Sequence, residues 1–380
     1  MKQEYKMKIA FVLSRDPLTS GGGVRSYIKN VSLELLKRKV KITIISPKET
    51  KNSVFEYIDI GSKPKNNIVF LLRLLIKAPF IKLASDSIIC ANRADFLFPF
   101  VLFHKNRLKG ILIHGTQYEG VKEKGKIFDI IYSYIEKFAI KNSDFIIFVC
   151  KQSERDYKHK YPFLFKNKRS IIIPVGIDTN NFRVLNKEKC RKITKLPLNK
   201  KIIISVGRFN PEKRYDLALK SFQKVLNKNK NCLLVLVGEG PERNKIESLS
   251  KQLDVNNNLI FTGLIDHNLM PYYLNSADIF LLCSDREGSP NVIKEALACG
   301  LPIISAKVGD VSEVITKYTG VLVDKDNINM LSNAILNAIV KKWNQKYMLE
   351  KARQLTWGMM VKKMIVFYDK LLKESNITVQ

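Results

Sequence analysis

The chain has 380 residues, 46% of them hydrophobic, and its 65 Lys and Arg outnumber its 35 Asp and Glu to give a formal charge of +30. A chain this rich in apolar residues can bury enough surface to offset its ordering entropy, which excludes a disordered protein. The positive charge is spread over both halves and is compatible with nucleic acid, anionic lipid or a phosphorylated substrate as the partner.

The cysteines and the first residues indicate the compartment. The six cysteines never form a C-x-x-C pair and most lie in apolar runs, so disulfides and zinc sites are not expected. The first apolar run is short and leads directly into Arg15 and Asp16, unlike a secretory signal peptide. No stretch reaches the roughly 18 apolar residues that span a bilayer. We therefore expect a cytoplasmic protein.

Apolar runs rich in β-branched residues recur through the first half of the chain, and each is followed by a helical pattern. Runs that are hydrophobic on both faces are typical of strands in a parallel sheet covered by helices. They predict a first doubly wound, Rossmann-like domain over 1-180. The predicted strands are 8-14, 41-46, 87-91, 110-115, 144-150 and 170-176.

Segment 68-83 is apolar but is interrupted by Arg73, Lys77, Pro79 and Lys82. A helix with this pattern can lie on an anionic membrane with its lysines at the headgroups, at the inner face of the cytoplasmic membrane. It can also be a surface helix with one face buried in the domain. The segment alone leaves both interpretations open.

Two features of the first domain are candidates for ligand contact. Gly22 and Gly23 follow the first strand and precede a helix, where free backbone amides can approach an anion; a flexible turn fits them equally well. His114 ends a predicted strand after three apolar residues, which suits a side chain that faces a ligand. A lone histidine is also common as a structural residue.

A second series of strand and helix patterns follows a polar stretch at 180-200. It predicts a second Rossmann-like domain over 181-355. It also predicts a C-terminal helix at 356-380, which can either pack across the hinge or return to the first domain. Two such domains would face each other across a cleft, because ligands of open α/β sheets bind at the carboxyl ends of the strands. The predicted strands are 201-207, 232-238, 258-263, 278-284, 301-306 and 320-324.

Cations follow the first strand of the second domain. Arg208 comes directly after Gly207 at the strand end, and Lys213 lies five residues further on, near the start of the next helix. Two cations in one such loop can hold a diphosphate and neutralise the charge that develops as it leaves. Two solvated charges in a basic protein would be the alternative if this pair stood alone.

Carboxylates follow a later strand of the same domain. Glu287 and Glu295 flank the stretch Gly288-Ser289-Pro290-Asn291, and a helix that starts near Pro290 would place Glu295 in its second turn. The free amides at this helix start would point at an anion. A nucleotide sugar needs these features together: amides and cations for the pyrophosphate, one carboxylate for the ribose and one for the sugar hydroxyls.

The order of these motifs resembles that of the retaining GT-B glycosyltransferases of family 4, also called the glycosyl transferase group 1 family. The resemblance covers nearly the whole chain and is most specific at 201-310. It implies a GT-B fold and transfer of a sugar from a nucleoside diphosphate to an acceptor hydroxyl with retention of configuration.

The resemblance also implies roles for individual residues. Arg208 and Lys213 would hold the diphosphate, Glu295 the ribose and Glu287 the donor sugar. His114 would contact the sugar and help to stabilise charge at the reacting carbon. The implied catalytic residues are thus His114, Arg208, Lys213 and Glu287. The implied donor-binding residues are Gly22, Gly23, Gly207, Arg208, Lys213, Gly238, Gly263, Leu264, Glu287, Gly288, Ser289, Pro290, Asn291, Val292 and Glu295.

Two stretches depart from the family pattern. Gly115-Thr116-Gln117 follows His114 where the family often has an acidic or small residue, and Asp310 stands where a small residue is common. Separately, Asp324-Lys325-Asp326 fits the D-x-D metal motif of another glycosyltransferase fold, but a polar turn is the better interpretation. We expect no cofactor and no essential metal, because Arg208 and Lys213 can supply the positive charge.

The expected partners are a nucleotide sugar and a sugar or lipid-linked sugar acceptor, in surface polysaccharide or glycolipid assembly, with an anionic membrane as a further partner of 68-83. Two alternatives stay open. One is a sugar-nucleotide epimerase of the same architecture. The other is a nucleic-acid-binding protein, which the charge suggests but for which the chain lacks a recognisable motif.

Overall fold

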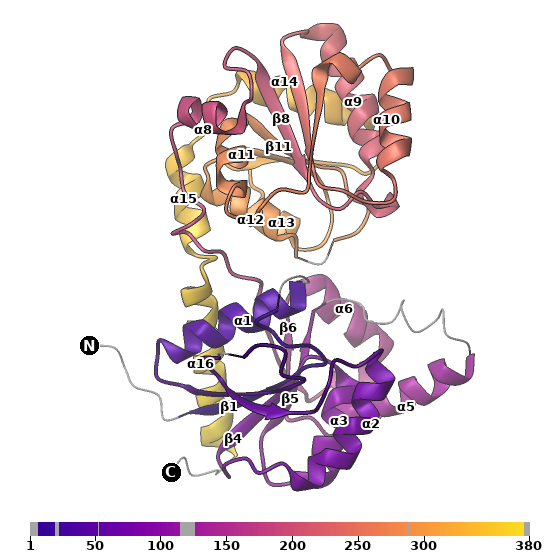
Figure 1. The fold of residues 1–380 in the computed structure, drawn as a ribbon, viewed down its shortest axis with the longest axis vertical. Coiled ribbons are helices and arrows are strands. Elements are labelled where there is room, and N and C mark those ends of the chain that lie inside the picture. The colour runs from indigo at the N-terminus through magenta and orange to yellow at the C-terminus, as the bar shows by residue number, and fades with distance from the viewer. Residues whose placement is uncertain (1–6, 20–22, 52, 115–125, 288, 376–380) are drawn as a thin grey trace. The chain divides into compact units, whose positions relative to one another are not determined.

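The computed structural model describes residues 7–19, 23–51, 53–114, 126–287 and 289–375. The chain divides into two compact units (Figure 1). The first consists of Met1–Gly176 together with Trp357–Gln380, and the second of Ile177–Thr356. The last helix therefore belongs to the first unit, although the second unit precedes it in the sequence.

The first unit contains a parallel sheet of seven strands in the order β3-β2-β1-β4-β5-β6-β7. Every residue of β4 and β5 is buried, as expected for strands covered on both faces. The edge strand β3 was not predicted, because its residues are exposed or half-buried and it starts and ends on acids. The strands are β1 (Lys8–Val12), β2 (Lys41–Ser46), β3 (Glu56–Asp59), β4 (Ser87–Ala91), β5 (Lys109–Ile113), β6 (Phe145–Phe148) and β7 (Arg169–Ile172).

Helices pack on both faces of this sheet. The C-terminal helix α16 (Trp357–Glu374) contacts α1 (Gly23–Leu36), and its apolar side chains join the core of the first unit. The ring of Tyr368, for example, lies 5.3 Å from that of Phe145 in β6. The other helices are α2 (Asn67–Lys77), the 3-10 turn η1 (Ala78–Phe80), α3 (Ala94–Phe103), α5 (Lys126–Lys141), α6 (Lys151–Lys160) and α7 (Pro162–Phe165).

Segment 68-83 forms α2 and η1 on the surface of the first unit. Phe70 and Leu74 are fully buried on one side of the helix, so it packs on the domain. Its opposite side exposes Leu72, Ile76 and, in η1, Phe80. Both sides of this segment are therefore apolar. Within the described ranges, none of the helices combines the length and hydropathy that crossing a bilayer requires.

The second unit contains a parallel sheet of six strands in the order β10-β9-β8-β11-β12-β13. Counted within the unit this order is 3-2-1-4-5-6, the doubly wound Rossmann arrangement, and the direction of winding switches between β8 and β11. Ligands of such sheets bind beyond the carboxyl ends of the strands at that switch. The strands are β8 (Lys201–Val206), β9 (Cys232–Val237), β10 (Leu259–Gly263), β11 (Ile279–Leu282), β12 (Ile303–Ala306) and β13 (Gly320–Val323).

Two apolar clusters, one on each face, form the core of the second unit. The fold is thus the predicted one, with two Rossmann-like domains. Helices cover both faces of the sheet, and each predicted strand of this half is present. The helical segments are α8 (Lys187–Thr194), η2 (Pro211–Lys213), α9 (Tyr215–Lys228), α10 (Arg243–Gln252), η3 (Asn256–Asn258), α11 (Met270–Ser276), α12 (Asn291–Ala298), α13 (Val311–Val314), α14 (Ile328–Val340) and α15 (Gln345–Arg353).

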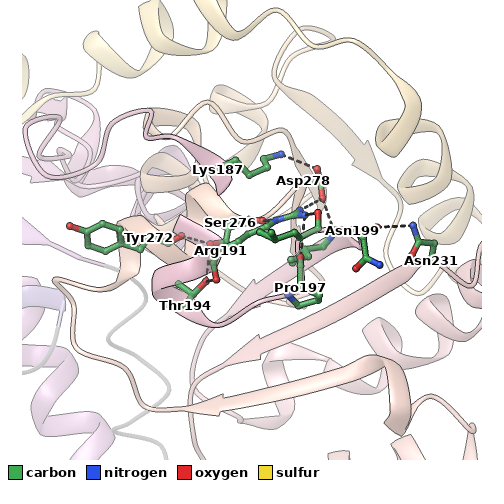
Figure 2. A network of polar contacts seen from close by, with 11 residues as sticks. Lys187, Arg191, Thr194, Pro197, Asn199, Asn231, Tyr272, Ser276 and Asp278 are labelled. Carbon is green, nitrogen blue, oxygen red and sulfur yellow. Dashed lines mark hydrogen bonds and ion pairs between the residues drawn. The ribbon is translucent and has the colours of Figure 1, made fainter. Parts of the chain in front are cut away.

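A polar network fixes the amino edge of the second sheet (Figure 2). The buried guanidinium of Arg191 in α8 lies 2.9 Å from Asp278 Oδ2 and donates hydrogen bonds to the carbonyls of Ser276 and Leu198. Asp278 Oδ2 also accepts a hydrogen bond of 2.8 Å from the backbone of Ile202 in β8. This network holds α8 against the start of the sheet, at the edge opposite to the strand ends discussed next.

Candidate functional site

Three glycines come together at the carboxyl ends of β8, β9 and β10. The amide of Gly238 donates to the carbonyl of Gly263 at 3.0 Å, and both residues have positive φ, +137° and +70°. A Cβ on Gly238 would lie 2.0 Å from the carbonyl oxygen of Gly207. Because only glycine permits this approach, the three predicted glycines leave a surface of bare backbone at the strand ends.

The predicted cation Lys213 and the predicted carboxylate Glu287 form an ion pair beside these glycines. The Lys213 ammonium lies 2.6 Å from Glu287 Oε1, and the Ser284 hydroxyl donates to the same oxygen at 2.7 Å. Only 22% of the Lys213 side chain and 12% of the Glu287 side chain are exposed. The pair joins the loop after β8 to the loop after β11, across the switch between the two strands.

Arg208 and Glu295 lie in the same unit but outside that pair. Arg208 is exposed, and within the part of the chain that the structure describes it forms no ion pair. Glu295 lies in α12, with Oε1 3.5 Å from Nε2 of His267, and a hydrogen bond to this carboxylate raises the pKa of His267. Leu264, which follows β10, is 80% exposed. An exposed cation and a partly buried carboxylate therefore remain accessible to a ligand.

The start of α12 has the predicted position. Pro290 is its N-cap and Asn291 its first residue, so the amides of Asn291 and Val292 have no partner within the helix, whereas that of Ile293 donates to the carbonyl of Pro290 at 3.3 Å. Oδ1 of Asn291 is buried and has no hydrogen-bond partner among the described residues. The helix dipole and these amides make this end attractive to an anion.

Ser289, directly before that helix start, is fixed by a contact that the sequence did not predict. Its hydroxyl donates a hydrogen bond of 2.6 Å to Asp310 Oδ2, and the same oxygen lies 3.1 Å from the ammonium of Lys294. Asp310 is one of the two departures from the family pattern. The structure therefore gives this departure a partner, Lys294, which the sequence placed on a helix without a role.

Arg214 is a further residue that sequence reasoning missed, although it directly follows Lys213. Its side chain contacts Asp285 at 3.1 Å, Asp326 at 2.6 Å and Asp216 at 3.0 Å. It thus ties together the loops after β8, β11 and β13. No local pattern distinguishes this arginine from the other surface cations of a basic chain.

The D-x-D triplet is a polar turn in which both carboxylates face cations. Asp324 lies 2.8 Å from Lys307, and Asp326 contacts Arg214. The Lys325 ammonium donates to the carbonyl of Asp285 at 2.6 Å. These contacts account for each member of the triplet.

Of the candidates in the first unit, His114 and Gly23 lie within the described residues. His114 follows β5; its Nε2 is buried without a hydrogen-bond partner among those residues, and its ring lies 4.9 Å from that of Tyr27. Burial lowers the pKa of His114 to about 4, so the imidazole is neutral at pH 7. Gly23 is the exposed first residue of α1. Gly22, Gly288 and the stretch 115-117 lie outside the described residues.

A cavity of about 600 Å³ lies near these loops, lined by residues of α9, α10 and the loop after β11, including Arg214 and Asp285. None of the predicted donor-binding residues lines it. We place the candidate site at the glycine ends, the Lys213–Glu287 pair and the start of α12. These groups lie where open α/β sheets bind ligands, and they offer amides, cations and carboxylates to a charged, hydroxyl-rich ligand.

Comparison with protein families shows which family the chain belongs to. Residues 186–355 match the family model described as "Glycosyl transferases group 1", and residues 21–181 match "Glycosyltransferase Family 4". The chain belongs to this family, the GT-B glycosyltransferases of family 4 or group 1, and is a glycosyltransferase. This assignment does not favour the epimerase alternative.

The chain is also similar to individual proteins. Protein CapJ of Staphylococcus aureus is 25% identical over 82% of this chain and 78% of its own length. The putative teichuronic acid biosynthesis glycosyltransferase TuaC of Bacillus subtilis is 31% identical over 44% of this chain and 40% of its own. The crystal structure of Anabaena Alr3699/HepE in complex with UDP has a similar fold, with a TM-score of 0.75, 15% identity and coverage of 96% of this chain and all of that one.

Proposed function

We propose that this glycosyltransferase moves a sugar from a nucleoside-diphosphate sugar to an acceptor hydroxyl with retention of anomeric configuration. The observation that carries the proposal is the Lys213–Glu287 pair at the switch between β8 and β11, next to the bare glycines and the start of α12. The UDP in the structure of the similar Anabaena protein also supports a nucleotide donor.

Each group of the site has a proposed role. Lys213 and Arg208 hold the diphosphate and neutralise the charge that develops on it. The amides at the start of α12 add hydrogen bonds to the same anion. Glu287, oriented by Lys213 and Ser284, accepts hydrogen bonds from the donor sugar, and Glu295 accepts them from the ribose. The proposed contact of neutral His114 with the sugar rests on the family resemblance.

In the proposed reaction, the bond between the anomeric carbon and the β-phosphate oxygen breaks while the acceptor oxygen bonds to that carbon on the same face. The acceptor proton passes to an oxygen of the leaving phosphate. Because Lys213 and Arg208 can stabilise the leaving group, we expect no essential metal. No side chain is assigned as a covalent nucleophile.

For the acceptor, we propose a lipid-linked sugar at an anionic membrane, in the assembly of a surface polysaccharide or glycolipid. The support is the outer side of α2 and η1, which exposes Leu72 and Ile76 of α2 and Phe80 of η1 at 55%, 71% and 81%. Lys77 and Lys82 are exposed next to them, in a chain of charge +30. Apolar side chains flanked by lysines suit the boundary between lipid headgroups and acyl chains.

The proposal is tested with the purified full chain. Thermal unfolding is first followed with UDP, GDP and their sugars, because a ligand that binds the native state raises the melting temperature. The stabilising nucleotide sugars are then incubated with lipid-linked acceptors, and the anomeric configuration of the product is read by NMR. Transfer with retention supports the proposal. Inversion, or interconversion of the free nucleotide sugar without an acceptor, contradicts it.

A further inference from the structure

A buried ion pair lies beneath the loop that carries Glu287. The Lys294 ammonium, in α12, and Asp310 Oδ2, in the loop after β12, are 3.1 Å apart, and only 1% and 4% of these side chains are exposed. Ser289 donates to the same carboxylate oxygen and also contacts the Lys294 ammonium. The residue before the N-cap of α12 and a residue within that helix therefore meet the loop after β12 at one carboxylate.

A contribution to the stability of the fold does not by itself explain this buried ion pair. Both charges lose their hydration on folding, and a buried ion pair is often no more stabilising than apolar residues of similar volume. The second carboxylate oxygen, Oδ1 of Asp310, is buried and has no hydrogen-bond partner among the described residues. The carboxylate thus depends on Lys294 and Ser289, and removal of either leaves a buried charge less well compensated.

The position of the Lys294–Asp310 pair indicates its role in the structure. Ser289 lies between Glu287 and the start of α12, so the hydroxyl that contacts the pair belongs to the loop that carries the sugar-binding carboxylate. Lys294 precedes Glu295 by one residue and is buried, whereas Glu295 is partly exposed. The ion pair therefore fixes Ser289 and helix α12. In the sequence, Ser289 and the first residues of this helix lie between Glu287 and Glu295, the two carboxylates that we propose bind the donor.

We propose that Lys294 and Asp310 are positioning residues that hold Ser289, and through it the start of α12 and Glu287, in the geometry that binds the donor. They do not touch the donor themselves. This inference rests on the proposed function, because the donor is a nucleotide sugar only under that proposal. It explains why an acid can stand at position 310: a buried lysine on the adjacent helix neutralises it.

The test compares the affinity for UDP and GDP with stability in four full-length variants. Ser289→Ala removes the link to the loop and leaves the ion pair, and Lys294→Met breaks the pair. Lys294→Met combined with Asp310→Gly removes both charges and covers the case in which Lys294→Met alone does not fold. Arg191→Met is the matched control, because it breaks the partly buried pair with Asp278 at the opposite edge of the same sheet (Figure 2).

We expect the dissociation constant for the stabilising nucleotide to rise about tenfold in Ser289→Ala and in both Lys294 variants, since small misplacements of a binding group are costly. The double variant should have a higher melting temperature than Lys294→Met but should bind the nucleotide as weakly. Arg191→Met should have a lower melting temperature than the unmodified chain. Its dissociation constant should stay within about twofold of that of the unmodified chain, because distant sites act independently.

Two outcomes contradict the inference: unchanged affinity in Ser289→Ala and the double variant, or an equal loss of affinity in Arg191→Met. Failure of the unmodified chain to bind either nucleotide contradicts the proposed function instead.

Discussion

The ammonium of Lys213 lies 2.6 Å from Oε1 of Glu287, and this contact joins residues 74 positions apart in the sequence. It links the loops after the two strands at which the second sheet changes its direction of winding. The pair gives the carboxylate a fixed orientation and places a cation at the point where we propose the diphosphate binds. Its removal should therefore affect both donor binding and the chemical step.

Lys213→Ala and Glu287→Ala should each lower kcat/KM for transfer by at least about 10²-fold, because a group that stabilises developing charge is lost. The fold should persist, since neither side chain is fully buried. Circular dichroism and steady-state release of the nucleotide check both statements. Lys187→Ala is the control, because it removes a lysine paired with Asp278 at 2.9 Å far from the strand ends. Near-unmodified rates in either site variant would count against the assigned roles.

Gly238→Ala should destabilise the second unit by about 3 kcal/mol, through strain at positive φ and a clash with a neighbouring backbone. A Cβ there would lie 2.0 Å from the carbonyl oxygen of Gly207. Urea unfolding followed by circular dichroism measures the loss. Gly23→Ala is the comparison, because a Cβ at that position meets nothing within 4 Å. Equal stability of the two variants would refute the close approach of the strand ends.

His114 makes the stability of the first unit depend on pH. Burial lowers its pKa from 6.5 to about 4, so between these values the unfolded chain binds a proton that the folded chain does not. The free energy of unfolding should therefore fall as the pH drops from about 6.5 to about 4, by about 3 kcal/mol from this group.

Comparison with His114→Gln isolates this effect, because glutamine does not titrate. Urea unfolding at pH 7.0, 6.0, 5.0 and 4.0 gives the free energy of unfolding of both proteins. The difference between these free energies should change in favour of the variant as the pH falls. A difference that is constant across this range would mean that the histidine is not buried in the neutral form.

The exposed side of α2 should govern binding to membranes. Leu72→Asn and Ile76→Asn are each expected to lower the partition onto anionic vesicles about tenfold, because each removes one apolar side chain from the lipid contact. Sedimentation with vesicles of phosphatidylglycerol and of phosphatidylcholine measures the partition, and salt should weaken it. Val340→Asn is the control, since Val340 is 80% exposed in the second unit. Binding that is equal in all variants would remove the membrane from the proposal.

Much of the fold follows from local pattern. The twelve predicted strands are present, because apolar β-branched runs of this length are stable only when both faces are covered. The strand that was missed, β3, lies at an edge and is partly exposed, so it lacks that pattern. The helix start at Pro290 was also predicted, since proline and the preceding turn residues act locally.

The sequence by itself determined two Rossmann-like domains, the strand ends that carry glycines, cations and carboxylates, and the family. Only the tertiary structure decided that Lys213 pairs with Glu287, that Arg214 ties three loops together, and that Lys294 compensates Asp310. The physical reason is that these contacts depend on strand order. In a parallel sheet, two loops are neighbours when the strands that precede them are neighbours in the sheet. The distance between side chains of such loops therefore cannot be read from their separation in the sequence.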